Sequence, residues 1–168
     1  MFIKKVLLAA ACMTAVVVFS VTSACAQNIR PGENGNIGSD GDDDMVNYEI
    51  VNVTVNGKDF EAEIGGTEAA EQFLALFPLS MEMGELNGNE KYFYLDTTLS
   101  SQPASPDEIK CGDIMLFGTD CVVVFYKTFS TSYAYTRLGR INNPEGLEEA
   151  AGNGSARVVF SQFGAKIG

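Results

Sequence analysis

The segment from residue 51 to residue 64 restricts the fold more than any other part of the chain. Apolar residues alternate with polar ones on both sides of Asn56-Gly57, a dipeptide preferred in the type I′ turn of a β-hairpin. Folding the segment about this turn places Val53 opposite Phe60, so the apolar residues of both strands share one face. We therefore predict an antiparallel hairpin that covers a core on one side and exposes its glutamates on the other.

Two later segments, Gly112–Phe117 and Cys121–Tyr126, are apolar on both faces of an extended chain. A strand with only one buried face alternates, so these segments predict central strands covered on both sides. We expect a turn at Thr119-Asp120 to join them. Such a turn places Cys121 opposite Gly118.

The other segments predict short strands and two helices. Further strands are predicted at residues 79–86, 91–95 and 156–160. One helix is expected to begin after Thr67 as its N-cap and to end before Pro78, and the other to be capped by Asn143 and to end near Gly152. Together these elements predict a mainly β fold, a closed antiparallel β-barrel of about eight strands with two short capping helices.

Residues 1–26 have the parts of an export signal: two lysines, an apolar run and the small-residue site Ala24-Cys25-Ala26. Two processing routes fit this sequence. Cleavage before Gln27 would release a secreted protein, whereas lipoprotein-type processing would acylate Cys25 and make it the first mature residue. Both routes predict an extracytoplasmic protein that is periplasmic, secreted or anchored by lipid at the cell envelope.

Residues 27–46 are rich in glycine, asparagine and aspartate and predict a flexible acidic linker before a domain at 47–168. The whole chain has 11 basic and 22 acidic residues and a net charge of −11. Cleavage after Ala26 would remove two lysines and leave −13. This charge argues against a nucleic-acid partner, and we expect membrane contact only through a lipid anchor at Cys25.

Two cysteines, Cys111 and Cys121, lie outside residues 1–26. The predicted hairpin separates their Cα atoms by roughly 20 Å at about 3.3 Å per residue. A disulfide requires less than about 7 Å between Cα atoms. We therefore predict two free, buried thiols.

The chain contains no histidine. This excludes Ser-His-Asp and Cys-His activation of a nucleophile and argues against a catalytic zinc site. The acidic run at residues 40–44 lacks the spacing of a calcium loop. We expect no metal and no cofactor.

Four segments share the blocks of one protein family in the same order. They are PLSMEM at 78–83, LNGNEKY at 86–92, GDIMLFG at 112–118 and FYKTFSTSYAYTRLGRI at 125–141. These segments resemble small bacterial proteins with a cyclophilin-like fold, and the resemblance covers residues 47 to about 160. It implies a closed antiparallel barrel capped by helices and related in shape to the prolyl isomerases.

The resemblance implies the shape but not the activity. In cyclophilins an arginine in a Phe-His-Arg block, on the strand after the first helix, hydrogen-bonds the prolyl nitrogen. The equivalent segment here, residues 79–86, has neither arginine nor histidine. We therefore carry over no catalytic residue.

The segment at 125–141 offers a candidate ligand-binding surface. In an extended chain Tyr133, Tyr135 and Arg137 lie on one face, where they suit an apolar peptide or a carboxylate-bearing ligand. Tyr126 and Phe129 are further candidates. The alternative is a barrel wall whose tyrosines pack under a helix while Arg137 pairs with a surface acid.

Two functions fit these observations. We expect an exported, noncatalytic module that binds a peptide, a protein or a small molecule. The alternative is a divergent peptidyl-prolyl isomerase or folding factor that uses Arg137 or Arg140 in a new geometry. Arg140 has the opposite parity, so it would share a face with Arg137 only across a β-bulge.

Overall fold

The predicted hairpin forms strands β1 (Tyr48–Val55) and β2 (Lys58–Gly65). The structure is a computed structural model that describes residues 47–164. Val53 lies opposite Phe60, as predicted. Asn56 and Gly57 have positive φ angles of 47° and 87°, as a type I′ turn requires. The predicted export signal and the predicted linker both lie outside the described residues.

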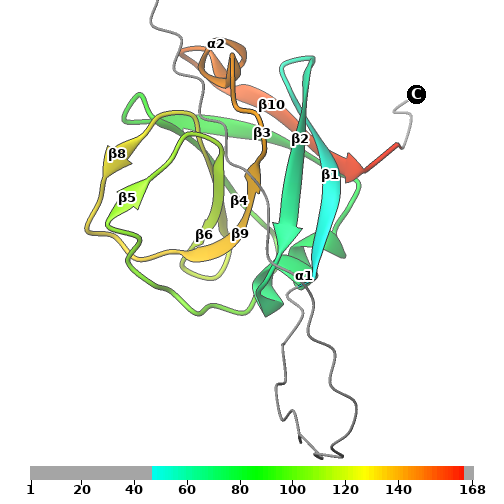
Figure 1. Cartoon of the computed structure of the whole chain (residues 1–168), viewed down its shortest axis with the longest axis vertical. Coiled ribbons are helices and arrows are strands. Elements are labelled where there is room, and N and C mark those ends of the chain that lie inside the picture. The colour runs from blue at the N-terminus through cyan, green and yellow to red at the C-terminus, as the bar shows by residue number, and fades with distance from the viewer. Residues whose placement is uncertain (1–46, 165–168) are drawn as a thin grey trace, which may run out of the picture. The chain divides into compact units, whose positions relative to one another are not determined.

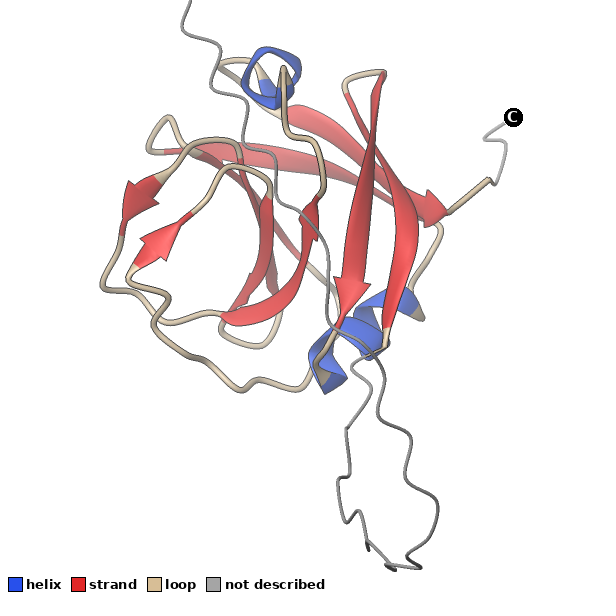
Figure 2. Ribbon diagram, viewed as in Figure 1, coloured by secondary structure: helices blue, strands red, loops and turns tan. Residues whose placement is uncertain are grey.

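The barrel is closed by eight antiparallel strands in the order β1-β10-β3-β4-β7-β6-β9-β2, and β5 and β8 form a separate two-stranded sheet (Figures 1 and 2). The remaining strands are β3 (Leu79–Leu86), β4 (Glu90–Tyr94), β5 (Glu108–Ile109), β6 (Asp113–Phe117), β7 (Cys121–Phe125), β8 (Phe129–Ser130), β9 (Thr136–Ile141) and β10 (Ala156–Gln162). The predicted mainly β fold, a closed antiparallel barrel, is confirmed.

Alternate residues of the barrel strands fill the barrel interior. They include Val51, Val53, Val55, Phe60, Ala62, Ile64, Met81, Met83, Ile114, Leu116, Val122, Val124, Val158 and Phe160. Helices α1 (Glu68–Leu74) and α2 (Leu147–Ala151) lie at opposite ends of the barrel (Figure 1) and add buried residues to the same cluster. The two helices therefore close the openings, as predicted.

The N-cap of α1 is confirmed, but that of α2 differs from the prediction. The Oγ1 atom of Thr67 accepts a hydrogen bond from the amide of Ala70 at 3.1 Å. Helix α2 begins after Gly146, whose φ of 78° is left-handed, so the predicted cap at Asn143 is wrong. Because a left-handed residue interrupts helical geometry, Pro144 lies in a turn before the helix rather than in its first turn.

The second predicted hairpin forms with a register that differs by one residue. Phe117, not Gly118, lies opposite Cys121. Gly118 has a φ of 66° and belongs to the connecting turn, because glycine tolerates this conformation without steric cost. Both cysteines are free thiols, as predicted; Cys121 is buried, whereas Cys111 is only partly buried.

A second apolar cluster covers the outer face of β6 and β7. The small β5–β8 sheet packs over this face, and the fully buried Ile109 of β5 lies opposite Phe129 of β8. The buried members of this outer cluster are Ile109, Met115, Cys121, Val123, Phe125 and Tyr135. Strands β6 and β7 are therefore covered on both faces, which explains their continuous apolar sequence.

Candidate functional site

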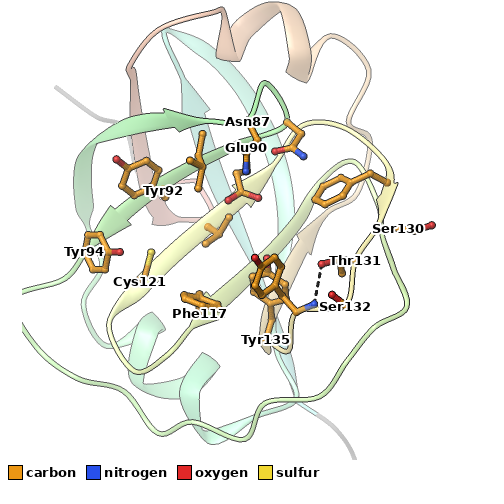
Figure 3. A pocket seen from close by; sticks show the side chains of 15 residues that line it. Asn87, Glu90, Tyr92, Tyr94, Phe117, Cys121, Ser130, Thr131, Ser132 and Tyr135 are labelled. Atoms are coloured by element: carbon orange, nitrogen blue, oxygen red, sulfur yellow. Dashed lines mark hydrogen bonds between the residues drawn. The ribbon is translucent and has the colours of Figure 1, made fainter.

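A pocket of about 610 Å³ lies on the outer face of the barrel, beside the β5–β8 sheet (Figure 3). Its floor is formed by β4 and β7, and its walls by the β3–β4 turn, by Phe117 and by the chain from residue 129 to residue 135. The lining residues are Leu86, Asn87, Asn89, Glu90, Tyr92, Tyr94, Phe117, Cys121, Val123, Phe129, Ser130, Thr131, Ser132, Tyr133 and Tyr135.

Strand β4 supplies three side chains to the pocket through its two-residue period. Glu90, Tyr92 and Tyr94 lie on its outer face and line the pocket, whereas Lys91 and Phe93 belong to the opposite face. The register with β7 places Tyr92 opposite Val123, which completes an apolar floor. The floor of the pocket is therefore part of the barrel itself.

The wall formed by the chain from residue 129 to residue 135 is held in place by aromatic contacts. The rings of Tyr133 and Tyr135 have their centroids 6.2 and 5.7 Å from that of Phe117. Tyr135 also meets the ring of Phe125 edge-on at 5.5 Å. Tyr135 is buried, but Tyr133 is 65% exposed. Tyr133 is thus an accessible aromatic side chain at the edge of the pocket.

Backbone hydrogen bonds tie this wall to the segment before β5. Tyr135 and Ala104 exchange two backbone hydrogen bonds of 3.0 and 2.9 Å. The amide of Thr131 donates to the carbonyl of Asp107 at 3.0 Å, and Oγ1 of Thr131 accepts from the amide of Tyr133 at 3.1 Å. The wall is therefore fixed at several points rather than held only by side-chain packing.

Glu90 is the one carboxylate among the residues that line the pocket, and the residue is only 8% exposed. Within residues 47–164 its side chain has no hydrogen bond or ion pair. Burial, and to a lesser extent the charge of Glu85, raises the pKa of Glu90 above its usual value. Figure 3 shows the carboxylate of Glu90 directed into the space between the labelled tyrosines.

The neighbouring lysine is not available to Glu90. Lys91 is 1% exposed and pairs with Oε2 of Glu85. Its Nζ atom also donates to the carbonyls of Gly152 and Gly154 at 2.9 and 2.5 Å. Because successive residues of a strand point to opposite faces, Lys91 and Glu90 lie on different sides of the barrel wall.

Three of the five predicted ligand-binding residues line the pocket, namely Phe129, Tyr133 and Tyr135. Tyr126 does not, because it packs in the barrel interior and donates a hydrogen bond to Glu85. Arg137 is exposed and also lies outside the pocket lining. The expected row of Tyr133, Tyr135 and Arg137 therefore does not form one binding surface in this pocket.

A β-bulge in β9 sets the direction of both arginines. Gly139 pairs with Ile114 and Arg137 pairs with Met115, so β9 advances by two residues where β6 advances by one. Close packing at the bulge requires glycine, since a Cβ atom on Gly139 would lie 2.1 Å from the carbonyl oxygen of Glu63. The bulge places Arg137 and Arg140 on the same outer face. In a strand without a bulge, these two residues would lie on opposite faces.

The sequence interpretation missed the half of the pocket that β4 supplies. Tyr92 and Tyr94 alternate within the predicted strand at 91–95, and Glu90 directly precedes that strand with the same parity. Their shared face could have been recognised from the two-residue period. The contribution of Phe117 and Cys121 could not be recognised in this way. The hairpin register, which differs by one residue from the prediction, decides that these two residues lie opposite each other.

Within residues 47–164 no cluster of three or more histidine, cysteine, aspartate or glutamate side chains is arranged to hold a metal ion. In the same range no helix has the length and apolar character needed to span a membrane.

Residues 53–161 match a family described as the cyclophilin-like family. This match includes the four segments that carry the family resemblance and every strand that forms the pocket. No curated protein and no solved structure gave a significant match to the chain.

Proposed function

The chain belongs to the cyclophilin-like family, and from this premise we propose that its barrel is a noncatalytic module that binds a peptide or a small molecule. The observation that carries the proposal is the pocket on the outer face of the barrel. Its volume of about 610 Å³ lies in the range of ligand pockets in general.

The composition of the pocket supports binding. Six of its lining residues are aromatic, and asparagine, serine and threonine side chains surround them. Ligand sites commonly combine such an apolar surface with a few polar groups that fix orientation. The exposed ring of Tyr133 provides further apolar surface that a ligand could cover.

The alternative, a divergent peptidyl-prolyl isomerase, has less support. None of the residues that line the pocket is an arginine. Strand β3, which corresponds to the strand that carries the catalytic arginine in cyclophilins, also contains no arginine. Arg137 and Arg140 face outward at the bulge of β9. An isomerase using either arginine would require a reaction site separate from this pocket.

The binding function can be tested by nuclear magnetic resonance with the full chain. Capped tripeptides that differ in the central residue, together with small aromatic fragments, would be titrated while amide shifts are followed. We expect shifts at pocket residues that weaken in Tyr133→Ala. Phe163→Ala is a matched control, because Phe163 is also an exposed aromatic residue, at 62%, but does not line the pocket.

Two outcomes would contradict the proposal. Absence of pocket shifts with every probe would remove the support for a binding site. Acceleration of cis–trans isomerisation in a proline-containing tetrapeptide, abolished by Arg137→Ala, would favour the isomerase instead, since the uncatalysed reaction takes tens to hundreds of seconds.

We also propose that the domain works outside the cytoplasm. The support is the sequence of residues 1–26, which has the parts of an export signal, and the acidic linker at 27–46. Export would leave the pocket facing peptides or small molecules of the cell envelope or the medium. A fusion of residues 1–46 to an enzyme that is active only after export tests this location directly.

A further inference from the structure

We propose that the pocket recognises an organic cation, an alkylammonium or guanidinium group, through the carboxylate of Glu90 and the surrounding aromatic rings. This inference rests on the proposed binding function and specifies the ligand class of the same pocket. It differs from the expectation from sequence, which joined Arg137 to the tyrosines and favoured a ligand bearing a carboxylate.

In the part of the chain that the structure describes, Glu90 lacks the partners that a buried carboxylate normally has. A carboxylate with little solvent access normally has a cationic partner or several hydrogen-bond donors, because desolvation of an unpaired charge is costly. Glu90 is 8% exposed and has no such partner within residues 47–164. The basic residue next to it, Lys91, is already bound to Glu85 and to two carbonyl groups. A cation in the pocket would provide the missing partner.

Aromatic rings stand on two sides of the Glu90 carboxylate. Tyr92 and Tyr94 are edge to face, with centroids 6.0 Å apart, on the same strand face as Glu90. Phe117 and Tyr135 stand at another side of the pocket, and Figure 3 shows the carboxylate directed between the two groups. Aromatic faces attract cations, and the attraction is larger where water is excluded.

Asn89 supplies a second acceptor that has no donor in this part of the chain. The Oδ1 atom of Asn89 is buried and has no hydrogen-bond partner within the described residues. Asn89 lines the same pocket and directly precedes Glu90. An ammonium group has three donors and a guanidinium group has five, so either can bond to more than one acceptor.

Charge in the pocket favours a cation over an anion. The lining contains one glutamate and no lysine or arginine. Arg137, which would have attracted a carboxylate, lies outside it. The net charge of −11 adds a general attraction for cations, so the test must separate this attraction from binding at Glu90.

The test compares matched charged and neutral probes on the full chain. One pair consists of the capped peptides Ala-Lys-Ala and Ala-norleucine-Ala, and the other of n-pentylammonium and n-pentanol. Affinities are measured from amide shifts at physiological salt, where the Debye length is about 8 Å and distant charges are screened. We expect each cation that enters the pocket to bind at least about tenfold more tightly than its neutral counterpart.

Two variants decide where this preference arises. Glu90→Gln keeps the shape of the side chain and is expected to abolish the preference for a cation. Glu82→Gln is the matched control, because Glu82 is an exposed carboxylate on β3 that does not line the pocket. It removes the same charge from the protein and is expected to leave the preference unchanged.

The outcomes separate this inference from the general binding function. Preference for the lysine peptide alone identifies a peptide side chain as the source of the cation, and equal preference for pentylammonium identifies a free amine. Equal binding of charged and neutral probes, or a preference that survives in Glu90→Gln, overturns the cation inference and leaves the binding function standing. If no probe of any kind shifts a pocket residue, both proposals fail.

Discussion

Tyr126 donates its phenolic hydrogen to Oε1 of Glu85 at 2.8 Å. The other carboxylate oxygen of Glu85 pairs with Lys91, whose ammonium group also binds two carbonyls in the segment after α2. This network joins β3, β4 and the end of β7 to the chain that leads into β10. Tyr126, a ligand-binding candidate from sequence, therefore occupies a structural position inside the barrel.

Removing the hydroxyl group of this tyrosine should affect stability and not the pocket. We expect Tyr126→Phe to lower the free energy of unfolding by about 1.5–3 kcal/mol, because it removes one hydrogen bond to a charged group. Urea denaturation measures the change, with Tyr48→Phe at an exposed site as the control. If Tyr126→Phe instead weakened ligand binding and left the stability unchanged, Tyr126 would be a binding residue and not a structural one.

Glu85 should make the fold sensitive to acid. Burial raises its pKa, but the hydrogen bonds from Lys91 and Tyr126 outweigh burial and hold the pKa below its ordinary value of 4.5. A carboxylate with a lowered folded pKa contributes stability above the unfolded value, and that stability is lost as pH falls through the folded pKa. We expect the urea concentration at the unfolding midpoint of the wild type to decrease as the pH is lowered below 4.5. The decrease should be smaller in Glu85→Gln. Equal pH dependence of the two proteins would exclude this role.

Glu90 should act on stability in the opposite direction. Its pKa is raised by burial and by the charge of Glu85, and the titratable groups of Cys121 and Tyr135 line the same pocket. The stability linked to Glu90 is therefore full below its ordinary value of 4.5 and decreases as pH rises through the folded pKa.

The corresponding substitution tests whether this carboxylate is unpaired. We expect Glu90→Gln to raise the urea midpoint near neutral pH and to have little effect below pH 4.5, while it removes the preference for cations. A loss of stability near neutral pH would mean that the carboxylate has a stabilising partner in the folded chain. If Glu90→Gln raised the stability and removed the preference for cations, the charged Glu90 would serve ligand binding while it destabilises the fold.

The barrel could be predicted because several local patterns agree. The register of β1 and β2 followed from Asn56-Gly57 and from the apolar alternation on both sides of the turn. The double-sided apolar pattern of β6 and β7 likewise predicted two covered faces. Such short-range signals determine strands and turns directly.

The site could be predicted only in part, because it depends on contacts distant in sequence. Phe129, Tyr133 and Tyr135 belong to one segment, but Glu90 joins them only after β4 pairs with β7. The position of Arg137 depends on a bulge that is set by pairing with β6. Neither the bulge nor the one-residue register change at Gly118 has a signal in the alternation itself.

The processing of the N-terminus is a separate prediction that mass measurement can decide. We expect the mature protein to begin at Gln27 after ordinary cleavage, or at an acylated Cys25 after lipoprotein-type cleavage. Peptide mapping of protein from the cell envelope and from the medium distinguishes the two, and Cys25→Ser should abolish only the lipid-linked form. An intact N-terminus beginning at Met1 in both fractions would contradict the export proposal.

Gly84 should control the position of a pocket ring. The glycine lies opposite Tyr92 in the β3–β4 pair, and a Cβ atom at Gly84 would lie 3.0 Å from two carbons of the tyrosine ring. We expect Gly84→Ala to displace this ring by a few tenths of an ångström and to weaken binding of the cationic probe roughly threefold, since the ring supplies part of a cation–π interaction worth on the order of 1 kcal/mol.

The matched control for this substitution is Gly154→Ala, where an added Cβ atom would meet nothing within 4 Å. Both variants should unfold cooperatively in urea, so that a change in affinity reflects the ring and not a loss of fold. Because the ring of Tyr92 occupies the space that a side chain at position 84 would fill, Gly84→Val should weaken binding further than Gly84→Ala. Equal affinity in wild type, Gly84→Ala and Gly84→Val would show that Tyr92 does not contact the ligand.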